Sequence, residues 1–299
     1  MDKLIKFMAY NERVSVVCAN TTELVNKVKE IHDLTPTTTA AMGRFITICG
    51  IMGYTDTKEN EDSITIQIKG NGPIGSMICV VRKEENISKV KACISNHLVE
   101  LPLKPNGKID VGGAVGNLGF LNIIRKNSIT DSEYNGVIPL VSGEIAEDFT
   151  EYFAKSEQKP TVLALGVLVN KDGVLSSGGY MINLMPDATE EGIQNIEKAL
   201  EGAPNISQLL LDNKSLEEIA EIVTGDKDVK VIQDDLKIEY ECDCNKEKFE
   251  DGLISIGKKD LEKIIDEDGK AEVVCHFCNK KYNFNKEELT SLLERIQKK

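Results

Sequence analysis

Four of the eight cysteines in this 299-residue sequence lie in two close pairs near the C-terminus. Cys242 and Cys244 form a Cys-x-Cys pair within "YECDCNK", and Cys275 and Cys278 form a Cys-x-x-Cys pair within "AEVVCHFCNK". Pairs this close can ligate a metal ion, close a disulfide, or do each in turn. Because four thiolates are a common tetrahedral ligand set for zinc, the spacing predicts one zinc ion per chain at these residues.

A zinc site with four thiolate ligands has no open position for a substrate water, which argues against a zinc hydrolase. His276 lies inside the second pair, and we expect it to face solvent or the outer shell of the site. The glycine-rich stretch at 111–120 fits neither a dinucleotide-binding motif nor a phosphate loop. Ser142 lacks the G-x-S-x-G context of a nucleophile. We therefore expect no enzyme activity and no catalytic residues.

The remaining histidines, His32 and His97, have no partner at a metal-ligand spacing, so we expect ordinary structural or surface side chains. The other four cysteines each stand alone among apolar neighbours, and we expect buried, unreactive thiols. They are Cys18, Cys49, Cys79 and Cys93.

The composition predicts a cytoplasmic protein. The N-terminus has no apolar stretch typical of a secretory signal. The most apolar segment, at 37–54, contains Arg44 and three glycines, so we expect a buried helix and not a membrane span. In a reducing cytosol, paired cysteines indicate metal or redox chemistry. The net charge of −13 repels phosphate backbones and argues against nucleic-acid binding.

The charge is distributed unevenly and suggests three regions. Residues 187–238 carry 5 basic and 13 acidic side chains, a net −8, whereas residues 1–186 carry 19 and 21. Residues 239–299 carry 12 and 15. We predict an N-terminal domain at 1–186, an acidic helical connector at 187–238, and a small cysteine domain at 239–299.

The N-terminal region is predicted to be an α+β domain, because strand patterns are grouped with few intervening helices. Apolar residues recur at helical spacing over 21–34, and Thr35-Pro36 begins the apolar helix described above. Alternating residues predict hairpins over 62–81 and over 161–186, the second turning at 171–173. A further helix over 141–157 is expected to begin at Ser142.

The connector shows two capping boxes, Asp187 with Glu190 and Ser215 with Glu218, and the second helix is expected to stop at Gly225. Its apolar stripes must rest on another part of the chain, most simply the first domain. These stripes are Ile193, Ile196 and Leu200, and Leu216, Ile219 and Val223. The cysteine domain ends in a helix capped by Asn285 and Glu288.

Several stretches resemble the redox-regulated bacterial chaperones of the heat-shock protein 33 family, the 33-kDa chaperonins. They are "IPLVSGEIAEDFTEYFAKSEQKPTVLALGVLVN" (138–170), "GGYMINLMPDA" (178–188), and the Cys-x-Cys pair followed by "EDGKAEVVCHFCNKKYNF" (267–284). The resemblance runs from about "TPTTTAAMGRF" (35–45) to the C-terminus, with domain order and cysteine spacing intact. The first thirty-odd residues and the stretch 122–136 are less similar.

The resemblance implies a cytoplasmic, ATP-independent holdase that is inactive when reduced and zinc-bound, and that oxidants such as hypochlorous acid, or peroxide with heat, activate. By position, Cys242, Cys244, Cys275 and Cys278 match the family's zinc ligands, which oxidise to Cys242–Cys244 and Cys275–Cys278 disulfides. The implied partners are unfolded or partly unfolded client proteins, with no nucleic acid and no membrane. Because newly exposed apolar surface seeks an apolar partner, we also expect a homodimer after oxidation.

Elementary energetics agree with this scheme. Zinc binding contributes on the order of 10–16 kcal/mol to the folding of a small module, and oxidation of the ligands would withdraw it. The apolar stripes of the connector would then become available to clients, and the surrounding acidic residues would keep the segment in solution. Two other classes stay open: a thiol oxidoreductase, which also uses Cys-x-x-Cys, and a zinc-ribbon nucleic-acid binder, which would need a basic face.

Overall fold

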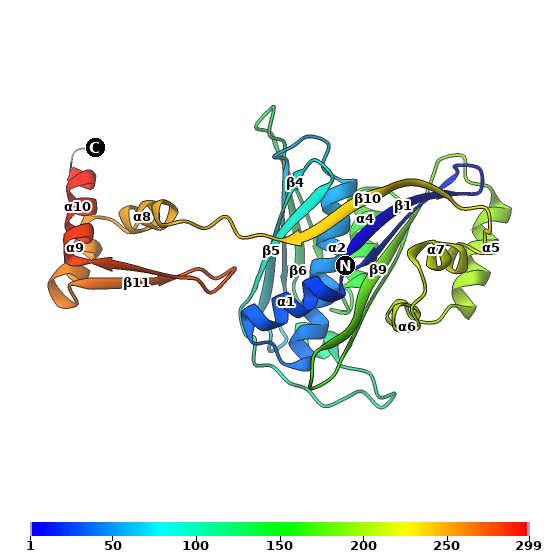
Figure 1. The fold of residues 1–299 in the computed structure, drawn as a ribbon, viewed down its shortest axis with the longest axis horizontal. Coiled ribbons are helices and arrows are strands. Elements are labelled where there is room, and N and C mark those ends of the chain that lie inside the picture. Colours follow the sequence, from blue (N-terminus) through cyan, green and yellow to red (C-terminus); the bar gives the residue numbers. More distant parts are fainter. Residues whose placement is uncertain (1, 298–299) are drawn as a thin grey trace. The chain divides into compact units, whose positions relative to one another are not determined.

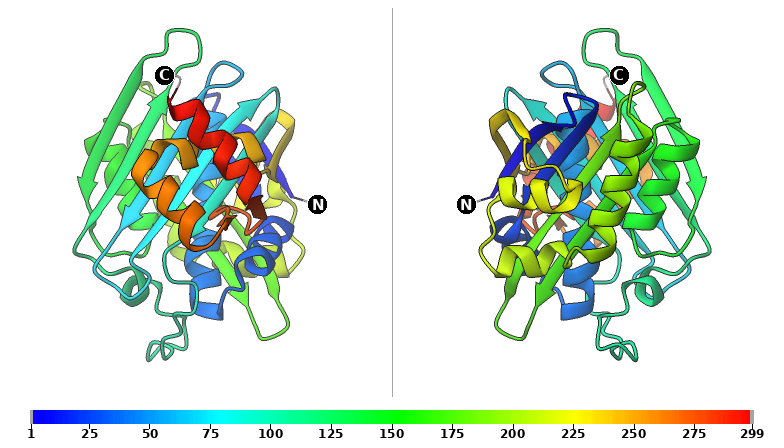
Figure 2. Two further views of the ribbon diagram at one scale, coloured as in Figure 1. Left: turned by 90° about the vertical axis from the view of Figure 1, so that its left-hand side faces the viewer. Right: turned by 90° about the vertical axis from the view of Figure 1, so that its right-hand side faces the viewer.

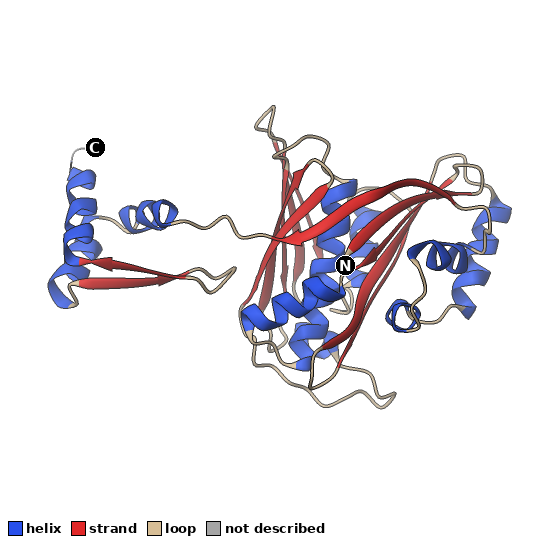
Figure 3. Ribbon diagram, in the orientation of Figure 1, coloured by secondary structure: helices blue, strands red, loops and turns tan. Residues whose placement is uncertain are grey.

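The chain forms two compact units, Met1–Glu241 and Cys242–Lys299, as seen in the computed structural model of Figure 1. Residues 2–297 are described. Each unit combines helices and strands, so the α+β prediction is confirmed (Figure 3). None of the helices in the described part of the chain has both the length and the apolar character needed to cross a bilayer.

The first unit is built on a ten-stranded sheet in the order β7-β6-β3-β4-β5-β10-β1-β2-β9-β8. β10 and β5 pair in parallel, and the other neighbouring strands of this sheet are antiparallel. Both predicted hairpins are confirmed, as β3–β4 and β8–β9. The strands are β1 (Lys3–Ala9), β2 (Val14–Asn20), β3 (Ser63–Lys69), β4 (Ser76–Glu84), β5 (Ile87–Ile94), β6 (Phe120–Lys126), β7 (Glu133–Pro139), β8 (Thr161–Val169), β9 (Val174–Leu184) and β10 (Lys230–Tyr240).

The centre of the first unit is α2 (Pro36–Thr55), the predicted apolar helix. Thr35 caps it by accepting a hydrogen bond from the backbone N–H of Thr38, and Pro36 occupies its first turn. The helix contacts β3, β4 and β5 from one half of the sheet and β2, β8 and β9 from the other. Because almost all of its side chains are buried, it carries no polar face.

Two further helices cover the same core, α1 (Thr22–His32), as predicted, and α4 (Ala146–Lys155). The expected start of α4 at Ser142 is wrong. The buried Asp148 carboxylate instead accepts hydrogen bonds from the backbone N–H groups of residues 141, 142, 143 and 145, which holds the chain in a turn before the helix begins. The glycine-rich stretch contains the short helix α3 (Val111–Val115).

The connector forms α5 (Glu190–Gly202), α6 (Ile206–Leu211) and α7 (Leu216–Thr224), which lie against β1, β2, β8 and β9 (Figure 2). The predicted box at Ser215 and the stop at Gly225 are confirmed. The box at Asp187 is wrong, because Thr189 caps α5 and Asp187 pairs with Arg13 instead. The apolar stripes do rest on the first unit: the buried members are Ile196, Leu216, Ile219 and Val223.

The end of the connector is a strand and not a helix. β10 lies between β5 and β1, where it joins the two halves of the sheet. Its side chain Ile238 packs on α2 at Gly50, where a Cβ atom would lie 1.8 Å from Ile238 Cδ1. Alternating apolar residues at 236, 238 and 240 face the core, a period of two that charged neighbours hide in the sequence.

The second unit contains α8 (Lys246–Ser255), α9 (Lys258–Glu267), the hairpin β11 (Lys270–Val274) and β12 (Lys281–Asn285), and α10 (Lys286–Gln297). The predicted capping box of α10 is confirmed, since Asn285 and Glu288 exchange hydrogen bonds of 2.9 Å. The apolar core of this unit is small: its buried members are Leu253, Leu261, Ile265, Tyr282, Phe284, Leu289 and Leu292.

Candidate metal centre

Two short segments of the second unit carry the paired cysteines. Cys242 and Cys244 lie in the loop before α8, which Asn245 caps by accepting a hydrogen bond from the Lys248 N–H. Cys275 and Cys278 lie in the turn of the β11–β12 hairpin. The turn is closed by a bond from the Cys275 N–H to the Lys280 carbonyl. A hairpin turn and a helix-capping loop thus present the two pairs as rigid local units.

The four sulfur atoms meet at one place. All four lie within 4.8 Å of one another, a set that could hold a metal ion. Two close sulfur contacts run between the pairs: Cys242 Sγ lies 3.7 Å from Cys275 Sγ, and Cys244 Sγ lies 3.4 Å from Cys278 Sγ. Three of the residues are half-buried, and Cys275 is buried. Pairs more than thirty residues apart in sequence therefore come together as the spacing predicts.

Local contacts shift the protonation of these thiols in different directions. Burial raises the pKa of Cys242 and of Cys278. At Cys244, burial also raises the pKa, but hydrogen bonds from Tyr282 and from the neighbouring thiols outweigh it and leave the pKa below its ordinary value. The contacts of Cys244 thus favour its thiolate form, which is the form that binds metals and reacts with oxidants.

Known proteins are similar to this chain over almost its full length. The profile of the family described as Hsp33 protein matches residues 2–285. The 33 kDa chaperonin of Clostridioides difficile (strain 630) is 42% identical over 295 residues, covering 99% of each chain. The chain belongs to the Hsp33 family. The family match also includes the first thirty-odd residues of the chain, where the resemblance described above is weaker.

Two further relatives agree with this membership. The 33 kDa chaperonin of Clostridium tetani (strain Massachusetts / E88) is 44% identical over 293 residues, covering 98% of each chain. The crystal structure of the 33 kDa chaperonin, or heat shock protein 33 homolog, from Thermotoga maritima superposes with a TM-score of 0.88 at 34% identity, covering 99% of each chain. The chain is therefore similar to chaperonins of this family in both sequence and fold.

Tyr282 is a residue of the centre that the sequence analysis missed. Its hydroxyl lies 2.9 Å from the Cys244 carbonyl and 3.2 Å from Cys244 Sγ. The hydrogen bond to Cys244 raises the pKa of Tyr282, so the phenol keeps its proton and remains a donor. Its ring packs against Phe249, with 4.7 Å between centroids. The sequence offers one signal for this role: Tyr282 and Phe284 are aromatic residues at alternate positions, and in β12 both side chains are buried.

The residues that we expected to lie outside the centre do so. His276 is exposed and is not one of the four clustered residues. His32 is buried beside the Tyr240 hydroxyl, at 3.5 Å. Cys275 and Cys278 occupy a hairpin turn and do not begin a helix, unlike the Cys-x-x-Cys motif of thioredoxin-like oxidoreductases.

The other four cysteines belong to the first unit. Cys18, Cys49 and Cys79 are buried and Cys93 is half-buried. Burial raises the pKa of Cys18 and of Cys49, which disfavours the reactive thiolate. The expectation that each stands alone is wrong for one pair, because Cys49 on α2 and Cys79 on β4 are hydrogen-bonded to each other.

Proposed function

We propose that this chain is a redox-regulated, ATP-independent holdase whose switch is the four-cysteine centre. The main support for the proposal is that four cysteine sulfurs lie within 4.8 Å of one another in a chain that belongs to the Hsp33 family. The ligands of the reduced state would be Cys242, Cys244, Cys275 and Cys278. The names of the relatives support the chaperone role, and the chemistry of the sulfurs supports the regulation.

The donor set fits zinc. Four sulfurs at about 2.3 Å from a common centre form a tetrahedron whose corners are about 3.8 Å apart. The contacts of 3.7 Å and 3.4 Å between the pairs are close to that value. When bound, zinc would link the two cysteine pairs and keep their sulfurs as thiolates. One zinc ion per chain is the expected stoichiometry.

Oxidation would convert the ligands into disulfides. Following the family resemblance, the pairs are Cys242–Cys244 and Cys275–Cys278. Each disulfide forms when two thiolates lose two electrons, and one molecule of hydrogen peroxide accepts them with two protons from solvent to give two waters. A sulfur bound in a disulfide is no longer a thiolate ligand, so the chain could not retain the metal.

Loss of the metal link would destabilise the second unit, because its apolar core is small. β10 ends at Tyr240, and Cys242 follows after a single residue, so unfolding can propagate along the chain into the connector. Release of the connector from the sheet would expose the side chains of Leu216, Ile219 and Val223, which are buried in the reduced fold. These are the surfaces that we expect to bind unfolded clients.

The partners of the oxidised chain would be unfolded or partly unfolded proteins and, through the same apolar surface, a second copy of the chain. We expect the protein to act in the cytoplasm, where thiols stay reduced until an oxidant arrives. The segment that would be released is acidic, which would keep it in solution and would disfavour nucleic acids as partners.

The test compares three samples for suppression of the aggregation of a denatured client: reduced with zinc, reduced and chelated, and oxidised. A chromogenic chelator follows zinc release in parallel. We expect no suppression by the first sample, partial and reversible suppression by the second, and full suppression by the third, because four free thiols can bind zinc again and two disulfides cannot. Equal activity of the first and third samples would contradict the redox switch. Equal activity of the second and third would contradict the locking role of the disulfides.

A further inference from the structure

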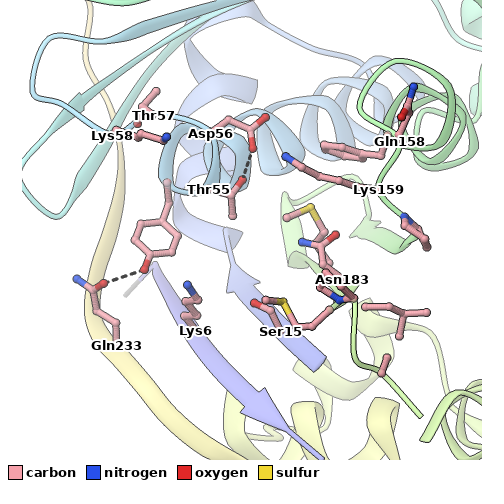
Figure 4. A pocket seen from close by; sticks show the side chains of 18 of the residues that line it. Lys6, Ser15, Thr55, Asp56, Thr57, Lys58, Gln158, Lys159, Asn183 and Gln233 are labelled. Carbon is pink, nitrogen blue, oxygen red and sulfur yellow. Dashed lines mark hydrogen bonds between the residues drawn. The ribbon is translucent and has the colours of Figure 1, made fainter. Parts of the chain in front are cut away.

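The first unit contains a cavity of about 1040 Å³ that borders its apolar core at Phe153 and Met181 (Figure 4). Its wall is formed by the C-terminal end of α2, by β1 and β9, and by the loop before β8. The connector contributes Ile193 of α5 and Gln233 of β10. All of the lining residues precede residue 242, so the cavity belongs to a single compact unit.

Three lysines from three different elements direct their ammonium groups into this cavity. They are Lys6 on β1, Lys58 after α2, and Lys159 before β8 (Figure 4). This convergence occurs in a chain whose net charge is −13, where random placement would favour acidic linings. A recess lined by charges of one sign focuses the electrostatic field and attracts ions of the opposite sign.

The positive charges are not balanced by acidic groups of the lining. Asp56, the carboxylate among the lining residues, is bonded to Arg125 at 2.6 Å. Within residues 2–297, neither Lys6 nor Lys58 has a carboxylate within ion-pair distance, and Lys159 lies 3.5 Å from Glu157, which itself pairs with Arg125 at 3.0 Å. The cavity is therefore electropositive.

A fourth lysine of the lining, Lys83, contacts the loop that follows α2. Lys83 Nζ donates to the carbonyls of Thr57 and Lys58, each at 3.4 Å. The Thr57 hydroxyl donates to the Gly53 carbonyl within the last turn. Lys83 therefore adds to the positive charge around the cavity, although its own ammonium group is bound to backbone carbonyls.

One part of the lining is apolar and favours an aliphatic group, although uncharged polar side chains such as Ser15 and Asn183 also line the cavity. Met181, Leu184 and Met185 from the end of β9 face the same space as Ile193. Tyr54 is not free to stack on a nucleobase, because Lys6 lies over its ring at 5.9 Å and its hydroxyl donates to Gln233 at 2.8 Å. Flexible methionine and leucine side chains adapt well to a hydrocarbon chain.

We propose that this cavity binds an amphiphilic anion, an aliphatic chain ending in a carboxylate. The carboxylate would lie among Lys6, Lys58 and Lys159, and the chain would lie along Met181, Leu184 and Met185. Because Ile193 of α5 borders the same space, the bound ligand would contact the connector as well as the sheet. This site is separate from the cysteine centre and does not depend on its redox chemistry.

The test measures binding of decanoate to the reduced, zinc-loaded full chain by calorimetry, with 1-decanol as the neutral ligand of equal length. We expect saturable binding of decanoate and at least tenfold weaker binding of 1-decanol. The double substitution Lys6→Met and Lys159→Met should weaken decanoate binding by about tenfold, since each exposed ion pair contributes modestly. Lys171→Met, which removes a lysine at the β8–β9 turn, is the matched control and should change nothing.

A second measurement uses the unaltered chain, so that it does not depend on the folding of the variants. In the methyl spectrum of methionine, decanoate should shift the signals of Met181 and Met185 and leave that of Met42, which is buried within α2, unchanged. The proposal is overturned if decanoate shows no saturable binding, if 1-decanol binds equally well, or if the lysine substitutions have no effect. Displacement of decanoate by ATP at lower concentration would overturn it in favour of a nucleotide site.

Discussion

The two compact units of this chain use the same local devices but differ in the apolar surface that holds them together. In the first unit, α2 is enclosed by the sheet, and a second apolar cluster lies beneath the connector helices. In the second unit, a hairpin and three helices share seven buried apolar residues. Helix caps are equally good in both: Ser215 in the first and Asn285 in the second each form a reciprocal box.

This difference indicates where each unit is vulnerable. A fold with a large apolar core loses only part of its stability when one contact is removed, whereas we expect a unit as short as Cys242–Lys299 to need a crosslink. In the function that we propose, this crosslink is a zinc ion held by four thiolates, and an oxidant would remove it without breaking the chain. The proposed redox sensitivity would then lie in the unit with the smaller core.

The largest expected effect is that of metal removal on the second unit. Replacing Cys242, Cys244, Cys275 and Cys278 by serine should abolish zinc binding and unfold this unit, because the metal contributes on the order of 10–16 kcal/mol to such modules. The first unit should keep its structure. Amide hydrogen exchange, read separately for the two units, together with metal analysis, measures both effects.

The matched control replaces Cys18, Cys49, Cys79 and Cys93, the four cysteines of the first unit, by alanine or valine. These variants should retain one zinc ion per chain and a protected second unit. Retention of zinc after loss of the four C-terminal cysteines, or equal loss of protection in both units, would contradict the division that we describe.

The sequence was sufficient where the structure is decided locally. Thr35-Pro36, the box at Ser215 and both hairpins depend on nearest neighbours, and these predictions are confirmed. The clustering of the four sulfurs was also predictable, because two cysteines that are two or three residues apart already lie close together on a turn. The clustering of cysteines that form close pairs in the sequence can therefore be predicted from one sequence.

The sequence was insufficient where a long-range contact decides. β10 is rich in charged residues, and its position between β5 and β1 depends on partners far away in the sequence. Asp148 delays the start of α4 by binding four backbone N–H groups, which no local rule predicts. Tyr282 reaches Cys244 across nearly forty residues. The hydrogen bond between Cys49 and Cys79 is a further contact of this kind.

A second prediction concerns the connector and compares two truncated chains. The boundary at residue 186 remains a prediction, and chains ending at 186 and at 241 test it. Both should fold in reducing buffer, but the shorter chain should be less stable by several kcal/mol. It lacks β10 and uncovers the apolar surface under Ile219 and Val223, and each large buried side chain contributes about 1.5–3 kcal/mol.

Urea unfolding followed by circular dichroism measures the difference between the two truncated chains. If the chain ending at 186 is unfolded in the absence of urea, the predicted domain boundary is wrong. If both chains have the same unfolding midpoint, the connector contributes no stability, and its release would cost nothing. Either result would mean that we have misjudged how the stability of the first unit is divided between its sheet and the connector.

A third, smaller effect is expected at Tyr282. Tyr282→Phe retains the packing against Phe249 and removes the hydroxyl that lies 3.2 Å from Cys244 Sγ. A thiolate without this donor is more nucleophilic, so zinc release by peroxide should be faster by about tenfold, as expected for a hydrogen bond to a charged group. Stopped-flow detection with a chromogenic chelator measures this rate.

The control for Tyr282 is Tyr10→Phe in the first unit, which also removes a single hydroxyl, one that donates to the Thr224 carbonyl at 2.7 Å. It should lower the stability of the first unit by about 1 kcal/mol and leave the rate of zinc release unchanged. Equal rates for Tyr282→Phe and the unaltered chain would show that the hydroxyl serves only the Cys244 carbonyl.

The smallest effect is expected from acid in the first unit. Burial raises the pKa of Glu144, but Lys104 and Arg44, which bond its two carboxylate oxygens, outweigh burial and hold the pKa below its ordinary value. A carboxylate with a lowered pKa in the fold stabilises it above the ordinary pKa, near 4.5, and this contribution is lost as the pH falls through the lowered value. We expect the second unit to respond differently, because acid would protonate the proposed thiolate ligands and weaken metal binding.

Glu144→Gln should therefore cost the first unit about 1 kcal/mol at pH 7 and progressively less below pH 4.5, where the unaltered chain also loses the charge. The matched control is Glu151→Gln, which removes a carboxylate from a more exposed pair with Lys155 on α4 and should have little effect at any pH. Urea unfolding of the chain ending at 241, measured between pH 3 and 7, isolates the first unit. A stability difference between Glu144→Gln and the unaltered chain that stays constant over this range would show that shape, and not charge, makes Glu144 important.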